Sequence, residues 1–150
     1  MTTVTPTTTP TSFTDLYVRI QQFYAGQVRL LDGMRAEEFA ATFTDAGRFD
    51  HAPGTPPLQG RRAIAEEMRR YQEARYAADP CQRRHWFNML EVFPGPDGTV
   101  STEYYALVLL TRPNEPVPVA APSCLVRDVL VDRDGELRVQ ERTVLPDYAI

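Results

Sequence analysis

Four long runs of strand-forming residues, separated by short turns, occupy the second half of this 150-residue chain. Each run is rich in β-branched and aromatic residues, and the segments between them carry Pro, Gly, Asn and Asp. The runs cover residues 81–93, 99–111, 120–132 and 136–145. Because short turns join strands that run in opposite directions, this pattern predicts an antiparallel meander.

Helical periodicity dominates the first half of the chain. Apolar residues recur at spacings of three and four from Phe13 to Leu31, which predicts a long amphipathic helix that ends at Gly33. Two further helices are expected at 35–43 and 61–78. Helices followed by a meander make an α+β layout. Long twisted strands would wrap around the first helix as a half-open cone, and the mouth of the cone would be the ligand pocket.

Composition fits one globular domain. The net charge of −4 argues against nucleic acid as a partner, and no apolar run is long enough to cross a membrane. The Thr/Pro-rich residues 1–12 are expected to form a disordered tail and not a signal peptide, so the domain would span 13–150. Cys81 and Cys124 match no metal or redox spacing. Free thiols in a reducing cytoplasm are expected, and a single disulfide is the alternative.

The first long strand holds one of the two histidines and the single tryptophan. Side chains alternate along a strand, so His85 shares a face with Phe87 and Met89, whereas Trp86 lies on the other face. If Phe87 and Met89 face the interior of the cone, His85 does too. It would then be a base placed inside a pocket. A hydrogen-bonded core histidine is the alternative.

Two carboxylates could pair with His85 and fix its tautomer. Asp32 closes the apolar stripe of the first helix, where a solvated loop residue is the alternative. Asp50 belongs to a short predicted strand at 48–51, before a Pro/Gly-rich loop at 52–60 that would form one lip of the pocket.

Other polar side chains fall on otherwise apolar faces and are candidates for ligand contact. They are Gln27, His51, Asn88, Tyr104, Arg127 and Arg142. The sequence contains no metal-ligand spacing, no Gly-rich phosphate loop and no nucleophile elbow. The candidate chemistry is therefore acid–base catalysis without a metal or a cofactor.

The order of these elements resembles the nuclear-transport-factor-2-like superfamily, and within it the SnoaL-like proteins of the dehydratase and polyketide-cyclase type. The resemblance covers residues 13–147. The segments that carry it are Leu31–Asp32, Phe43–Thr44–Asp45 with Phe49, His85-x-x-Asn88, and Arg142 with Asp147.

The resemblance implies a cone-shaped barrel in which a mixed, mostly antiparallel sheet wraps around the N-terminal helix. It also implies a deep apolar cavity and, often, a homodimer formed through the sheet. Asp32 would pair with His85 as the catalytic dyad. A tyrosine often stands five residues before that aspartate; here the position is Gln27, and Tyr24 would substitute for it. An arginine that holds an acid group would be Arg142 or Arg127.

The implied function is that of a cofactor-independent cyclase, dehydratase or isomerase acting on an aromatic polyketide-type intermediate. The side chains expected to contact this ligand are Tyr24, Gln27, Asp50, His51, Phe87, Met89, Tyr104, Arg127 and Arg142. Two other classes remain open. One is a non-catalytic protein that binds an intermediate and steers pathway flux, and the other is a small structural subunit of a ring-hydroxylating dioxygenase.

Overall fold

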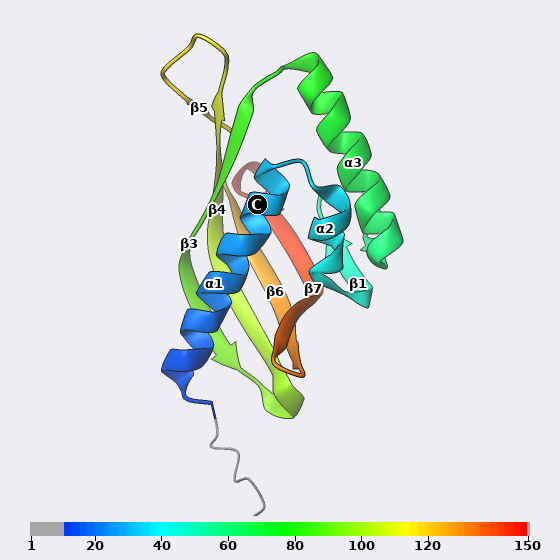
Figure 1. Ribbon diagram of the computed structural model, residues 1–150, viewed down its shortest axis with the longest axis vertical. Coiled ribbons are helices and arrows are strands. Elements are labelled where there is room, and N and C mark those ends of the chain that lie inside the picture. The colour runs from blue at the N-terminus through cyan, green and yellow to red at the C-terminus, as the bar shows by residue number, and fades with distance from the viewer. Residues whose placement is uncertain (1–10, 150) are drawn as a thin grey trace, which may run out of the picture.

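The computed structural model describes residues 11–149 as three helices and one mixed sheet (Figure 1). The helices are α1 (Phe13–Asp32), α2 (Ala36–Ala41) and α3 (Arg61–Ala78). The strands are β1 (Phe43–Asp50), β2 (Leu58–Gln59), β3 (Gln82–Pro94), β4 (Thr99–Thr111), β5 (Val119–Ala120), β6 (Cys124–Arg133) and β7 (Glu136–Pro146). Of the predicted disordered tail, residues 1–10 lie outside the described residues.

The strand order in the sheet is β2-β1-β7-β6-β4-β3, with β5 paired to β4. Strands β3, β4, β6 and β7 pair antiparallel in succession, which confirms the predicted meander. Strand β1 adds parallel to β7, so the sheet is mixed. The sheet does not close, and α1 lies across one of its faces (Figure 1). The predicted α+β cone is confirmed in this half-open form.

The strand predicted at 48–51 begins earlier than the sequence indicates, because the turn-forming residues 44–47 also belong to β1. The pairing of β1 with β7 shifts register between Phe43 and Arg48, which gives this part of the strand an irregular, bulged course. Gly47 is required there, since a Cβ atom at this position would lie 2.9 Å from the Cβ of Phe43. The turn-forming residues 44–47 thus form a distorted part of a strand.

Helix α1 ends where the sequence predicts, but a different residue turns the chain. Gly33 has a φ of −86°, whereas Met34 adopts the left-handed conformation with a φ of 57°. The backbone N–H of Met34 donates to the carbonyl of Leu31 (3.1 Å). The helix therefore stops directly after Asp32, which leaves that carboxylate at the end of the buried stripe.

Strand β3 contains a bulge that reverses the faces of its second half. The pairing with β4 shifts register between Asn88 and Glu91, and Met89 has a φ of 54°. The bulge adds one residue, so the inward positions after Phe87 are Leu90 and Val92. The prediction that Met89 faces the interior is therefore wrong, and its side chain is 66% exposed.

This assignment of faces predicts unequal effects for two neighbouring truncations. Met89→Ala should change the free energy of unfolding by less than about 0.5 kcal/mol, because an exposed side chain loses few contacts. Leu90→Ala should cost about 1–2 kcal/mol, because Leu90 packs against the core while remaining partly accessible. Urea denaturation of both variants measures the difference. A larger loss for Met89→Ala would show that simple alternation continues through the bulge.

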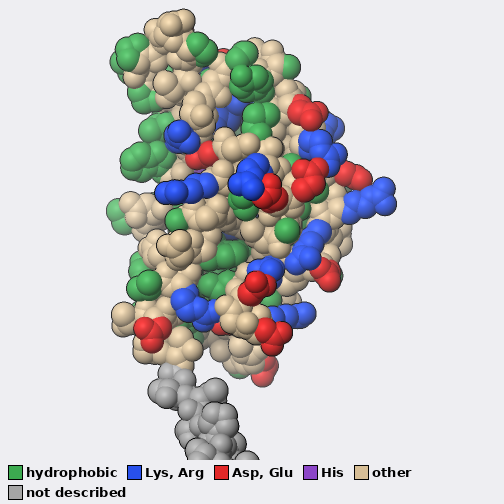
Figure 2. All heavy atoms as spheres, viewed as in Figure 1, with side chains coloured by type: hydrophobic (Ala, Val, Ile, Leu, Met, Phe, Trp, Pro, Cys, Tyr) green, Lys and Arg blue, Asp and Glu red, His purple; other side chains and the backbone are tan. Residues whose placement is uncertain are grey.

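The outward side of α3 carries charges of both signs. Ion pairs link Arg62 to Glu66 and Arg70 to Glu67 on its surface. In Figure 2, basic and acidic side chains are interspersed over the side of the molecule where α3 lies. Such a surface is typical of a solvated helix. Within residues 11–149, no helix is long and apolar enough to span a membrane.

Candidate active site

Helix α1 and strand β3 bring Asp32 and His85 into direct contact. The Oδ1 atom of Asp32 lies 2.7 Å from Nδ1 of His85 and also accepts the backbone N–H of His85 (3.1 Å). A carboxylate only accepts hydrogen bonds, so Nδ1 is assigned the proton. The Nε2 atom of His85 then carries the free lone pair.

The two members of this pair differ in exposure. The His85 side chain is 24% exposed, whereas that of Asp32 is 8% exposed. A solute can therefore reach the imidazole while the carboxylate stays shielded behind it. This is the arrangement expected of a base that a buried anion orients.

Asp50, the other candidate carboxylate, has no hydrogen bond or ion pair with His85 among the described residues. Asp50 lies one residue beyond the buried Phe49 and so points to the other side of β1. Its carboxylate lies 3.7 Å from the guanidinium of Arg48 on that side. The expected contact of Asp50 with the ligand is therefore not supported by its position.

An aromatic cluster continues inward from His85. The ring of Phe87 meets the imidazole edge-on, with 6.4 Å between ring centroids. Tyr104 lies 4.7 Å from Phe87, and Tyr24 lies 4.7 Å from Tyr104. Elements α1, β3 and β4 thus supply a row of aromatic rings that leads inward from the imidazole.

A buried ion pair lies within this cluster. The guanidinium of Arg142 donates to both oxygens of Asp128, at 2.9 Å to Oδ1 and 2.7 Å to Oδ2. Their side chains are 3% and 0% exposed. Burial acts to lower the pKa of Arg142, but the adjacent Asp128 carboxylate outweighs it and raises that pKa above its usual value.

Two tyrosine hydroxyls complete the contacts of Asp128. Tyr24 donates to Oδ2 at 2.8 Å, and Tyr104 donates to the same atom at 3.2 Å. Burial raises the pKa of both tyrosines well above the usual value, and the Asp128 charge raises both further. Both hydroxyls therefore stay protonated and act as donors. The Tyr24 hydroxyl also meets that of Thr102 at 2.6 Å.

Gln27, at the position where the resemblance implies a tyrosine, holds Arg142 in place. Its Oε1 accepts from Nη2 of Arg142 (2.6 Å), and its Nε2 donates to the hydroxyl of Thr42 (2.7 Å). Thr42 in turn donates to the carbonyl of Phe39 (2.6 Å). This chain of hydrogen bonds fixes the orientation of the buried amide.

The structure separates the two candidate arginines. Four aromatic rings surround the Cζ atom of Arg142, at 5.6–6.0 Å from their centroids. Arg127 instead lies on the outer face of the sheet, with its side chain 57% exposed and 3.4 Å from Glu103. The expected inward contact of Arg127 is therefore wrong, because Val126 and Asp128 take the inward positions of β6.

Sequence reasoning missed Asp128 and Thr102, both of which are buried. A signal for Asp128 existed, since it alternates with the apolar residues Val126 and Leu130 along one face of a predicted strand. Thr102 carried no such signal, because threonine is common on either face of a strand.

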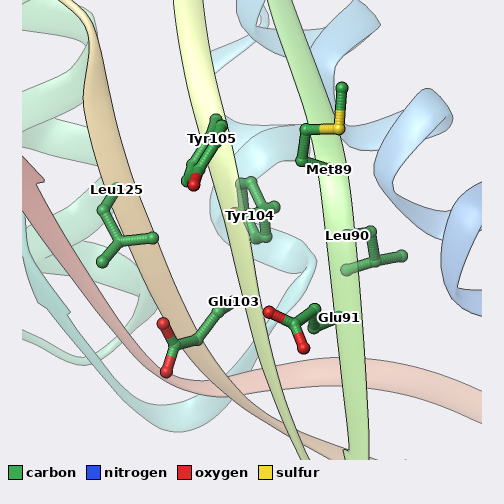
Figure 3. A pocket seen from close by; sticks show the side chains of 7 residues that line it. All are labelled: Met89, Leu90, Glu91, Glu103, Tyr104, Tyr105 and Leu125. Atoms are coloured by element: carbon green, nitrogen blue, oxygen red, sulfur yellow. The ribbon is translucent and has the colours of Figure 1, made fainter.

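Two hollows are lined by residues of β3 and β4. The larger, of about 420 Å³, lies on the outer side of the sheet where the β3 bulge meets β4 and β6, and Met89 and Tyr105 are exposed there. Figure 3 shows Met89 and Leu90 leaving β3 in different directions. The second, of about 300 Å³, is lined by Gln82, whose amide nitrogen lies 3.5 Å from the carbonyl oxygen of Asp32. This second hollow therefore adjoins the end of α1.

The second histidine lies apart from the dyad. His51 follows the end of β1, and its side chain is 16% exposed. Its Nε2 atom lies 3.8 Å from Oε1 of Glu67 on α3. The two histidines thus lie beside two different carboxylates, Asp32 of α1 and Glu67 of α3.

Known structures resemble this fold over almost the whole chain. Aln2 from a Streptomyces species is 40% identical, with a TM-score of 0.81 and 94% of each chain covered. ActVI-ORFA from Streptomyces coelicolor is 37% identical, with a TM-score of 0.81, over 89% of this chain and 98% of that one. A protein from Catenulispora acidiphila in complex with S-DNPA is 43% identical, with a TM-score of 0.80, over 90% and 96%.

A comparison with curated proteins found no match. The family model described as the SnoaL-like domain matches residues 14–143, which is most of the chain. Together with the dyad-bearing cone described above, this match establishes the family. The chain belongs to the SnoaL-like domain family.

Proposed function

We propose that this protein is a cofactor-independent acid–base enzyme acting on an aromatic polyketide-type intermediate of antibiotic biosynthesis. Cyclisation, dehydration and isomerisation all fit the proposed chemistry. The observation that carries the proposal is the 2.7 Å hydrogen bond between His85 Nδ1 and Asp32 Oδ1. The complex of a 43%-identical relative with S-DNPA supports a small-molecule ligand.

The proposed mechanism starts at the free nitrogen of His85. Nε2 removes a proton from a carbon next to a ligand carbonyl, and the Asp32 carboxylate stabilises the imidazolium that forms. The proton then returns to a different atom, or to a leaving oxygen, which gives isomerisation or dehydration. General acid–base catalysis of this kind contributes about 10²–10⁴-fold to the rate. Phe87, which contacts the imidazole edge-on, provides an apolar surface for the ligand ring.

Proton exchange tests this proposal without knowledge of the natural substrate. The protein is incubated in D₂O with 1-tetralone, an aromatic ketone with an acidic C–H next to its carbonyl, and deuterium uptake is followed by mass spectrometry. We expect the wild type to accelerate exchange over buffer. Binding of S-DNPA is measured in parallel by calorimetry.

The outcomes of this experiment divide the candidate functions. Binding of S-DNPA with exchange at the buffer rate would favour a non-catalytic protein that holds an intermediate and steers flux. Stable co-purification with a large iron–sulfur subunit would instead favour a structural subunit of a dioxygenase.

We propose a cytoplasmic location for the protein, because the free thiols of Cys81 and Cys124 would stay reduced there.

We further propose a homodimer formed through the outer face of the sheet. Large apolar side chains are exposed there: Trp86, Met89, Phe93 and Tyr105. Trp86→Glu should convert dimer to monomer, because a charge would replace the largest apolar contact. Light scattering coupled to size-exclusion chromatography measures the mass. Val18→Glu is the matched control, since Val18 is also exposed but lies on α1. Equal masses for wild type and Trp86→Glu would refute this interface.

A further inference from the structure

His51 carries a buried nitrogen that lacks a partner. Its Nδ1 atom is inaccessible to solvent and has no hydrogen-bond partner among the described residues. Leaving a buried polar atom unpaired is unfavourable, and such atoms are rare in folded proteins. The unpaired Nδ1 atom of His51 therefore needs a structural or functional explanation.

Glu67 favours the His51 tautomer that carries its proton on Nε2. Its Oε1 lies 3.8 Å from Nε2, too far for a hydrogen bond but close enough to favour a proton on that nitrogen. A hydrogen bond from Arg70 lowers the pKa of Glu67, and the charge of Arg70 lowers it further, although partial burial opposes this. Glu67 is thus anionic at neutral pH. In neutral His51 the proton then lies on Nε2, and Nδ1 is a pure acceptor.

His51 belongs to the same interior as Arg142. Phe49 pairs with Arg142 in the parallel β1–β7 ladder, so the two side chains point to the same side. His51 lies two residues further along the chain, on the same side as Phe49, with 5.6 Å between their rings. Phe43 continues the contact, 5.5 Å from Phe49 and 5.6 Å from the guanidinium carbon of Arg142.

The two histidines are complementary in their free nitrogens. His85 donates from Nδ1 to Asp32 and leaves Nε2 open, whereas His51 presents Nε2 to Glu67 and leaves Nδ1 open. Each therefore offers one acceptor nitrogen, and a carboxylate from a helix lies beside the other ring nitrogen. They lie toward opposite ends of the strand order, with His85 on β3 and His51 directly after β1.

We propose that His51 is a second ligand-contacting group, whose Nδ1 accepts a hydrogen bond from an O–H group of the ligand. Glu67 is its positioning residue. This inference rests on the proposed function, since it assigns a second contact to the same small-molecule ligand. The ligand class is thereby narrowed to aromatic molecules that carry a hydroxyl group away from the carbon that His85 attacks.

A loop of mostly exposed residues follows His51 directly. Residues 53–57 are exposed. In the described structure, the hydrogen bonds of this loop join the N–H and the hydroxyl of Thr55 to the carbonyl of Ala52. These bonds are internal to the loop, so the loop can move as a unit without breaking the β1–β7 ladder. A ligand that reaches Nδ1 would require such a movement, because this atom is inaccessible to solvent.

The chain offers a direct spectroscopic test, because it contains only two histidines. Protein with ¹⁵N-labelled histidine and no affinity tag gives two sets of imidazole nitrogen signals, assigned with His51→Phe and His85→Phe. S-DNPA is the probe. We expect the free protein to show His51 protonated on Nε2. Addition of S-DNPA should shift its Nδ1 signal in the direction expected for an acceptor that gains a hydrogen bond.

Affinity provides the second measurement. His51→Phe keeps the ring against Phe49 and removes both nitrogens; it should weaken S-DNPA binding by about tenfold, the effect of one hydrogen bond. Glu67→Gln should weaken binding less and should also mix the His51 tautomers, which a purely structural role would not do. Glu66→Gln is the matched control on the exposed side of the same helix, where Glu66 pairs with Arg62. It should bind like wild type.

The result separates this inference from the proposed function. If S-DNPA shifts the His85 signals but not those of His51, and His51→Phe binds as tightly as wild type, the second contact is wrong and the dyad site stands. If S-DNPA shifts neither histidine, the proposed ligand site and the His51 contact fall together. A shift of the His51 Nδ1 signal with normal binding by Glu66→Gln supports the inference.

Discussion

His85→Phe should lower the rate of enzyme-dependent proton exchange by about 10²–10⁴-fold, the usual contribution of general acid–base catalysis. The phenyl ring keeps the volume and the edge contact with Phe87 but has no lone pair. Affinity for S-DNPA should change only a few-fold, because the imidazole acts on the proton that moves and contributes little to holding the rings. Deuterium uptake by 1-tetralone and calorimetry with S-DNPA measure the two effects separately.

Asp32→Asn should reduce the rate by a similar order, as in other dyads whose carboxylate orients an imidazole. The amide can still accept the backbone N–H of His85, so the local geometry is kept. It cannot stabilise the imidazolium by charge. Two matched controls are available: Arg84→Ala on the outer face of β3, and Asp15→Asn in the first turn of α1. If His85→Phe and Asp32→Asn both bind S-DNPA and exchange at the wild-type rate, the dyad is not catalytic.

Asp128→Leu should destabilise the fold by about 3–5 kcal/mol, because it leaves the Arg142 guanidinium buried without its counter-charge. Two tyrosine hydroxyls, from Tyr24 and Tyr104, lose their acceptor in the same variant. At roughly 2–4 °C per kcal/mol for a domain of this size, the Tm should fall by about 10 °C. Urea and thermal denaturation followed by circular dichroism measure both quantities.

The double variant Asp128→Leu/Arg142→Leu makes this prediction specific. Removal of both charges eliminates the unpaired ion, so the double variant should be more stable than Asp128→Leu alone. Glu66→Gln, which breaks an exposed pair with Arg62, should leave stability almost unchanged. Additive losses in the double variant would show that the two side chains act independently, contrary to their bidentate contact.

The helical stripe of α1 and the meander could be predicted because each rests on a repeated local pattern. The position of Asp32 beside His85 was reached from the end of the stripe and from a family resemblance, and the structure joins the two residues by hydrogen bonds. The start of β1 could not be predicted, since residues 44–47 have turn chemistry but pair irregularly with β7. Tertiary pairing overrides local preference there.

The errors on β3 and β6 have different origins. The bulge at Met89 has no Gly or Pro to mark it, so simple alternation placed Met89 inside when it is outside. Arg127 and Asp128, in contrast, could have been assigned correctly from alternation with Val126 and Leu130. The buried network around Arg142 joins residues more than 100 positions apart, such as Gln27, and no local pattern encodes that pairing.

The bulge in β3 also makes this strand tolerant of a change in chain length. Met89 is the extra residue between two correctly paired segments, Asn88 opposite Tyr105 and Glu91 opposite Glu103. Deletion of Met89 would leave a regular strand in which Leu90 and Val92 keep their inward faces. His85 lies upstream of the bulge and would not move. This strand should therefore accept the loss of one residue at the bulge without displacement of the imidazole from its carboxylate.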